Sequence, residues 1–242
     1  MIEIVPAIDI MGGRCVRLTK GDYTSTKVYD ASPLDMSLQY ADSGVRRIHM
    51  VDLDGASEAR PINLHTLEQI AVRSGLEIEW GGGIADADAL KSAFDAGATQ
   101  TIVGSVAALK PELFRAWLLG FGAEKILLGS DVRNETVAVK GWRECAALTV
   151  SEQINLFLPN GLKYVICTDI SRDGMLQGPS FELYRRLQEE FPQVVFTASG
   201  GISSMDDIVR LDELGMPKVI VGKAIYEGRI SLEDIRKWSL NG

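Results

Sequence analysis

The sequence predicts a single (β/α)8 barrel that consists of two related half-barrels. The chain has 242 residues, close to the roughly 250 that one such barrel needs. Short apolar, β-branched runs alternate with amphipathic stretches along its length, which is typical of parallel βαβ units. The chain also matches itself, because Gly82-Gly83-Ile84 returns as Gly200-Gly201-Ile202. An open, doubly wound sheet is the alternative for this alternation, and the repeat favours the closed barrel.

Eight apolar runs are the expected strands of this barrel. They are Ile2–Ile8, Arg47–Val51, Glu77–Trp80, Thr101–Val103, Lys125–Leu128, Tyr164–Cys167, Val194–Thr197 and Val219–Val221. The helical patterns between them cover Pro33–Ser43, Pro61–Ser74, Ala87–Ala96, Leu109–Leu119, Val150–Leu158, Ser180–Glu190 and Ser204–Leu214. Because no Pro-rich or Ser-rich linker divides the chain, we expect one domain over residues 1–242.

The internal repeat relates the half-barrel of residues 1–120 to that of residues 121–242. Ile102-Val103-Gly104 matches Ile220-Val221-Gly222 at the same spacing as the two glycine pairs. The matched polar and glycine positions follow predicted strands, and barrel active sites lie at the C-terminal ends of the strands. The repeat therefore predicts that both halves bind similar groups across one barrel mouth.

The composition restricts the classes of partner. A formal net charge of -8 argues against nucleic acid and anionic membranes as partners, so a bound phosphate must be held locally. The three cysteines, Cys15, Cys145 and Cys167, lack the spacing of a disulfide framework or a zinc site. No signal peptide and no membrane-spanning apolar run is recognised, so a cytoplasmic protein is expected.

Glycines follow four of the predicted strands in corresponding places of the two halves. The third and seventh strands end in Gly81-Gly82-Gly83 and Ser199-Gly200-Gly201, and the fourth and eighth in Val103-Gly104-Ser105 and Val221-Gly222-Lys223. Glycines at such places let backbone N–H groups approach a phosphate. They can also simply turn the chain. Their occurrence in both halves favours two phosphate sites, and hence a bisphosphate ligand that spans the barrel mouth.

Asp9 and Asp131 end the first and fifth predicted strands, which lie opposite each other in an eight-stranded barrel. Such a pair can supply a general base and a general acid if the surroundings separate the two pKa values. A structural cap is the alternative for each aspartate. The symmetric placement favours catalysis.

Further polar residues follow the second and sixth strands, in VDLDGA and TDISRDGMLQGP. Their hydroxyl and carboxylate groups could hold substrate hydroxyls or assist the acid, although Asp-Gly pairs are also ordinary turns. These residues are Asp52, Asp54, Thr168, Asp169, Arg172 and Asp173.

Two loops are candidates for covering the site. Arg17 and Lys20 open a polar stretch that is long for a βα loop, so a lid over a charged ligand and a surface loop are both possible interpretations. Trp142 in the loop after the fifth strand can stack on a heterocycle or pack on the rim. Of the two histidines, His49 is expected to be structural because it lies in a strand, and His65 forms no metal-ligating cluster.

The motifs VPAIDIMGGRCVRL, GDY, VDLDGA, GGGI, DVRNETVAVKGW, TDISRDGMLQGP, SGGIS and VGKAIYEG cover almost the whole chain. With them the chain resembles the histidine-biosynthesis isomerases that act on phosphoribosylformimino-AICAR phosphate (ProFAR). The resemblance implies an Amadori rearrangement of an aminoaldose to an aminoketose. Asp131 then matches the acid that opens the ribose ring, and Asp9 matches the base that removes the C2′ proton. Thr168 and Asp173 match supporting residues.

The resemblance also implies how the bisphosphate substrate is held. Arg17 and Trp142 match loop residues that cover the AICAR half of the substrate. The positions expected to bind the substrate and its phosphates are Arg17, Gly82, Gly83, Gly104, Ser105, Trp142, Gly174, Ser199, Gly200, Gly201, Gly222 and Lys223. No metal or organic cofactor is expected, and nothing in the sequence suggests more than a monomer.

Three other functions remain as alternatives to ProFAR isomerisation alone. They are the related cyclase of the same pathway, an additional activity on phosphoribosyl anthranilate, and a regulator that binds phosphate without catalysis. The sequence differs from the family at Ala85, where arginine is frequent, and at Ser105, where threonine is common. Both differences lie at one of the two predicted phosphate sites and neither affects the aspartate pair.

Overall fold

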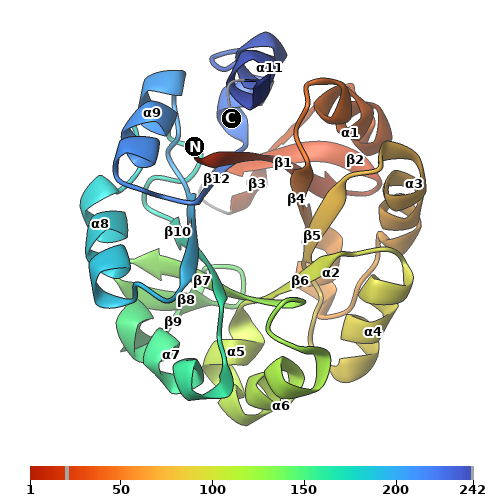
Figure 1. Ribbon diagram of the computed structural model, residues 1–242. Helices are drawn as coiled ribbons and strands as arrows, with labels where there is room; N and C mark the ends of the chain where they lie inside the picture. The colour runs from red at the N-terminus through yellow and green to blue at the C-terminus, as the bar shows by residue number, and fades with distance from the viewer. Residues whose placement is uncertain (20–21, 241–242) are drawn as a thin grey trace.

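The computed structural model describes residues 1–19 and 22–240, which form a closed (β/α)8 barrel (Figure 1). The strands follow one another around the ring as β1 (Glu3–Met11), β4 (Arg47–Asp52), β5 (Glu77–Gly81), β6 (Gln100–Val103), β7 (Ile126–Arg133), β10 (Tyr164–Asp169), β11 (Val195–Ser199) and β12 (Lys218–Val221). The ring closes because β12 pairs in parallel with β1. The predicted fold class is confirmed.

Helices surround this ring of strands (Figure 1). They are α1 (Pro33–Asp42), α3 (Leu64–Ser74), α4 (Ala87–Asp95), α6 (Pro111–Phe121), α7 (Val150–Phe157), α8 (Phe181–Glu190), α9 (Met205–Glu213) and α11 (Leu232–Leu240). Local sequence fixes several of their starts: Ser32 accepts a hydrogen bond from the backbone N–H of Asp35, and Thr149 and Glu152 form a capping box. The shorter helices are α2 (Leu53–Glu58), α5 (Ser105–Leu109), α10 (Lys223–Tyr226) and the 3-10 turn η1 (Leu158–Asn160).

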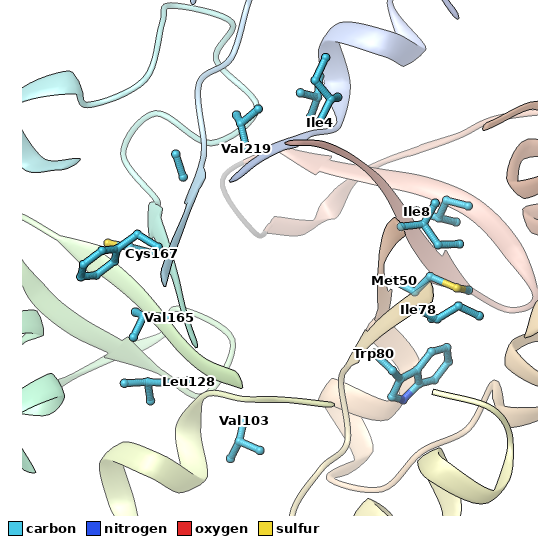
Figure 2. Packing of buried hydrophobic residues seen from close by; sticks show 14 of the residues in the cluster. Ile4, Ile8, Met50, Ile78, Trp80, Val103, Leu128, Val165, Cys167 and Val219 are labelled. Atoms are coloured by element: carbon cyan, nitrogen blue, oxygen red, sulfur yellow. The ribbon is translucent and has the colours of Figure 1, made fainter. Parts of the chain in front are cut away.

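The main hydrophobic core lies between the strands and the outer helices. Figure 2 shows Ile8, Met50 and Val165 among the strand side chains that contribute to it. Because side chains alternate along a strand, the intervening residues point into the barrel. There a smaller apolar cluster fills the centre, formed by Val5, Ala7, Leu127, Ile166 and Ile220. This cluster supports the floor of the barrel mouth.

Two helices differ from their predicted extents. The helix expected from Pro61 begins at Leu64, because the Asp52 carboxylate accepts the backbone N–H groups of Ile62 and Asn63 and holds that segment outside the helix. The helix expected over Leu109–Leu119 corresponds to α6, which begins at Pro111, whereas Leu109 ends the separate short helix α5, so the structure divides the chain between the two helices at Lys110. The division occurs because Pro111 is accommodated in the first turn of a helix and not in its interior.

Two βα loops contain hairpins that the sequence did not indicate. After β1 the chain forms β2 (Arg14–Thr19) and β3 (Asp22–Val28), and after β7 it forms β8 (Thr136–Val139) and β9 (Glu144–Thr149). Each hairpin extends its barrel strand by antiparallel pairing. Lys20, expected in the first of these loops, lies outside the described residues. Among the described helices, none is long and apolar enough to cross a membrane.

Candidate active site

A cavity of about 380 Å³ opens at the C-terminal ends of the barrel strands. It brings together all the residues predicted for catalysis and binding. These are Asp9, Arg17, Gly82, Gly83, Gly104, Ser105, Asp131, Trp142, Thr168, Asp173, Gly174, Ser199, Gly200, Gly201, Gly222 and Lys223. The ends of seven of the eight barrel strands position most of them, and the two hairpins supply Arg17 and Trp142. Their individual roles stay predictions.

Asp9 forms an ion pair with Arg17 inside the cavity. The guanidinium Nη1 donates to the Asp9 carboxylate at 2.7 Å, and Nη2 donates to the carbonyl oxygen of Ala7 at 2.9 Å. The antiparallel pairing of β2 with β1 places Arg17 next to Asp9. The same guanidinium lies over the Tyr226 ring, 5.3 Å from its centroid. Arg17 is thus held within the site, rather than above it as a lid residue would be.

Asp131 receives a hydrogen bond from an aromatic residue of the second hairpin. The Trp142 indole Nε1 donates to the carboxylate at 2.7 Å. Trp142 has a φ of 67°, in the left-handed region, and the preceding Lys140 and Gly141 are left-handed as well. Backbone strain of this kind often accompanies functional sites. Burial raises the pKa of Asp131, while the hydrogen bonds from Trp142 and Thr168 oppose the rise.

Asp173 lies between the charged groups of the site. Burial raises its pKa to about 6; the cations of Arg17 and Lys223 act against that rise, whereas Asp9 and Asp131 reinforce it. The Lys223 ammonium also donates to the carbonyl oxygen of Gly174 at 2.8 Å, which ties the loop after β10 to the end of β12. Asp173 can therefore hold or release a proton near neutral pH.

The doubled glycines are required by contacts between neighbouring loops. A Cβ atom on Gly82 would lie 2.1 Å from the carbonyl oxygen of Asp52, and one on Gly83 would lie 2.4 Å from the carbonyl carbon of Arg60. In the second half, a Cβ on Gly200 would lie 2.7 Å from the carbonyl oxygen of Asp169. Both pairs also line the cavity. Close packing of loops thus accounts for these glycines in each half, in addition to any approach to a phosphate.

The aspartates that end β4 and β10 hold loops together. Asp52 is fully buried and accepts hydrogen bonds from the backbone of Gly55, Ile62 and Asn63. Asp169 accepts from Ser171 and Ser180. Neither aspartate lines the cavity, and the same is true of Asp54 and Arg172. For these four residues the structure favours a structural role over contact with substrate hydroxyls.

Comparison with known proteins identifies the family. The family model described as "Histidine biosynthesis protein" matches residues 3–231 of the chain. The chain belongs to this family. The resemblance that the motifs indicated is confirmed.

Curated members of the family are similar over their whole length. A protein of Parabacteroides distasonis is 48% identical over 239 residues, which are 99% of this chain and 100% of that protein. A protein of Bacteroides thetaiotaomicron is 50% identical over 236 residues, 98% of this chain and 99% of its own. Both are named 1-(5-phosphoribosyl)-5-((5-phosphoribosylamino)methylideneamino)imidazole-4-carboxamide isomerase, the activity on the compound abbreviated above as ProFAR.

In this member of the family, His49 lines the cavity, although its place in a strand had suggested a purely structural residue. The register of β4 and β5 places it beside Glu79, whose side chain is fully buried. A polar residue at an inward-facing position of a strand was the only available signal, and its partner on the next strand could not be recognised from sequence. Within residues 1–19 and 22–240, no cluster of histidine, cysteine, aspartate and glutamate could hold a metal ion.

Proposed function

We propose that this chain is an aldose–ketose isomerase of histidine biosynthesis that converts ProFAR to its ribulosyl isomer. The observation that carries the proposal is the position of two carboxylates. Asp9 on β1 and Asp131 on β7 have three strands between them in either direction around the ring, and both line the same cavity. A shift from aldose to ketose requires one proton to be delivered and another to be removed, which two opposed carboxyl groups can do.

The surroundings of the two aspartates support different roles. Burial, by raising the pKa of Asp131, favours a carboxyl group that can donate its proton to the ribose ring oxygen and open the ring. Asp9 forms an ion pair with the guanidinium of Arg17, which holds the carboxylate in place at the cavity wall for removal of the C2′ proton. Thr168 lies beside Asp131 in the register of β10 and β7 and completes the hydrogen bonding of the acid.

Cations near the glycine sites support binding of a phosphate at each end of the substrate. A Cβ atom on Gly222 would lie 2.1 Å from Nη2 of Arg17, so this guanidinium already lies over one site, where Lys223 also lines the cavity. At the other site, the backbone N–H of Lys140 donates to the Ser105 hydroxyl at 2.9 Å. Lys140 also lines the cavity, and its ammonium group, which pairs with Glu144 at 2.9 Å, would have to exchange that partner for the phosphate to supply the positive charge that Ala85 lacks. We expect a cytoplasmic monomer that needs neither a metal nor an organic cofactor.

Replacing each aspartate tests the proposal. The wild-type protein should isomerise ProFAR, followed by the change in absorbance. Because each proton-transfer group contributes about 10²–10⁴-fold, Asp9→Asn and Asp131→Asn should each lower kcat by at least about 100-fold. Binding of the product, measured by calorimetry, should survive in both variants.

Asp88→Asn, a change in the first turn of α4 outside the cavity, is the matched control and should leave kcat unchanged. Ordinary kcat in either active-site variant would refute the assigned roles. A parallel assay on phosphoribosyl anthranilate distinguishes a single activity from a dual one.

A further inference from the structure

His49 and Glu79 form a polar pair inside the barrel that the two-aspartate mechanism does not use. They are register partners on β4 and β5. The His49 side chain is 13% exposed and lines the cavity, whereas that of Glu79 is 0% exposed. Nδ1 of His49 lies 3.7 Å from Oε2 of Glu79, and neither atom has a hydrogen-bond partner among the described residues. Because buried polar atoms are almost always hydrogen-bonded, this pair requires an explanation.

Charged neighbours leave one Glu79 oxygen for the histidine. Oε1 of Glu79 lies 3.6 Å from Nε of Arg47 and 3.7 Å from Nζ of Lys218. Of the two Glu79 oxygens, Oε2 is the one nearer to Nδ1 of His49. A hydrogen on Nδ1 of His49, donated to Oε2 of Glu79, would give both buried atoms a hydrogen-bond partner. The present distance of 3.7 Å is long for such a bond, but hydrogen bonds at active sites often shorten when the substrate binds. The buried carboxylate therefore favours the tautomer with Nδ1–H, which leaves the lone pair of Nε2 free to face the cavity.

The position of His49 places this lone pair beneath the reacting part of the substrate. Ala7 pairs with His49 across β1 and β4, while Asp9 pairs with Val51, so His49 lies one inward-facing layer below Asp9. His49, Asp9 and Asp131 all line this cavity, so a sugar held between the two aspartates would present hydroxyl groups to the layer that contains His49.

We propose that His49 is a further catalytic residue, which accepts the proton of the C2′ hydroxyl when the enolamine becomes the ketose, and that Glu79 is its positioning residue. This inference rests on the proposed isomerase function and adds a step to it. After ring opening and removal of the C2′ proton, the intermediate has a C1′=C2′ double bond and a hydroxyl group on C2′. Formation of the ketone requires the loss of that hydroxyl proton, and neither aspartate has been assigned this task.

With His49 included, every proton that is transferred in the reaction has a donor and an acceptor. Asp131 gives its proton to the ring oxygen, and Asp9 takes the C2′ proton. The O–H bond at C2′ then breaks toward Nε2 of His49, its electron pair forms the C2′=O bond, and the C1′=C2′ pair takes the proton back from Asp9 at C1′. The imidazolium, balanced by Glu79, passes its proton to the Asp131 carboxylate. All three groups return to their starting forms, with no oxidant or reductant consumed.

Three variants test the proposal, each assayed on ProFAR in D2O. His49→Gln should lower kcat by at least about 100-fold, and Glu79→Gln by about 10- to 100-fold, as for outer partners that orient a histidine. In both, the substrate recovered before completion should carry deuterium at C2′, because Asp9 still removes that proton while the ketone forms slowly. Glu77→Gln is the matched control: it removes another Arg47 partner without contacting His49, and should behave as wild type.

A spectroscopic measurement distinguishes positioning from folding. The chain has only two histidines, so ¹⁵N NMR of His49 can be assigned with His65→Gln. Wild type should show the Nδ1–H tautomer, and Glu79→Gln should show a larger share of the other one. His49→Gln leaves the ion pairs of Glu79 with Arg47 and Lys218 in place, so it provides the kinetic test even if Glu79→Gln does not fold.

The possible results separate this inference from the function on which it rests. A wild-type protein that does not convert ProFAR refutes both. An active wild type together with a His49→Gln variant of equal kcat refutes only the role of His49. A slow His49→Gln variant that introduces no deuterium at C2′ also refutes it, because the defect then precedes the enolamine.

Discussion

The hydrogen bond from Trp142 to Asp131 should determine the pH at which the acid loses its proton. Trp142→Phe removes the indole donor, 2.7 Å from the carboxylate, and keeps an aromatic ring. A hydrogen bond to a charged group is worth about 1.5–3 kcal/mol, and one pKa unit corresponds to about 1.4 kcal/mol. Because Trp142 and Asp131 are both partly exposed, the lower end of this energy range applies. The pKa of Asp131 in the variant should therefore rise by about one unit.

The direction of the effect on activity follows from the role proposed for Asp131, which is to donate a proton. Asp131 must be protonated to act, so the decline of activity at high pH should move to higher pH by about one unit. The assay is kcat/KM for ProFAR across the pH range, since this quantity reports the free enzyme. KM should rise as well, because Trp142 lines the cavity.

Trp238→Phe is the matched control for this experiment, because the Trp238 indole donates to the carbonyl oxygen of Ile2, away from the cavity. Its pH profile should equal that of wild type. A profile of Trp142→Phe that stays in place or moves to lower pH would contradict the role of Asp131 as the acid.

Three further predictions concern the free energy of unfolding. Gly83→Ala should destabilise the protein by about 3 kcal/mol, because the residue has a φ of +77° and its Cβ would lie 2.4 Å from a backbone atom of Arg60. Gly120→Ala in α6, where the Cβ would meet nothing within 4 Å, should instead stabilise it by about 0.5–1 kcal/mol in the same urea titration. Asp173→Asn should remove one pH dependence of the unfolding free energy. The pKa of Asp173 is about 6 in the folded state and lies above the ordinary 3.8, so the folded state binds the proton more tightly than the unfolded state. The wild-type protein therefore loses stability as the pH rises from about 4 to about 6. Relative to wild type, the unfolding free energy of the variant should therefore increase by about 1–2 kcal/mol between pH 5 and pH 8. A difference that stays constant over this range would show that folding does not raise the pKa of Asp173.

The barrel and the opposed aspartates could be predicted because their signals repeat. Apolar strand patterns occur eight times, and Asp9 and Asp131 occupy the same place in each half. The hairpins could not be predicted in this way. Asp22–Val28 and Glu144–Thr149 are mostly polar or exposed, so no buried face imposes an alternating pattern on them.

The points that the sequence left open share one cause, which is that a residue type does not reveal its spatial neighbour. Asp52 could hold substrate or cap a loop, and only the fold shows that backbone N–H groups surround it. His49 was expected to be structural until β5 placed Glu79 beside it. The doubled glycines indicated phosphate sites, and the fold adds the backbone of the adjacent loop as a second reason for them.

The order of strands around the ring has a consequence for the origin of this active site. Asp9 comes from the opening strand of one half and Asp131 from the opening strand of the other, so half a chain folded alone would hold only one carboxylate of the pair. Two identical halves joined as a pair would already contain both carboxylates, one from each copy. A duplication of the gene segment would then need only to link such a pair and let its equivalent aspartates diverge.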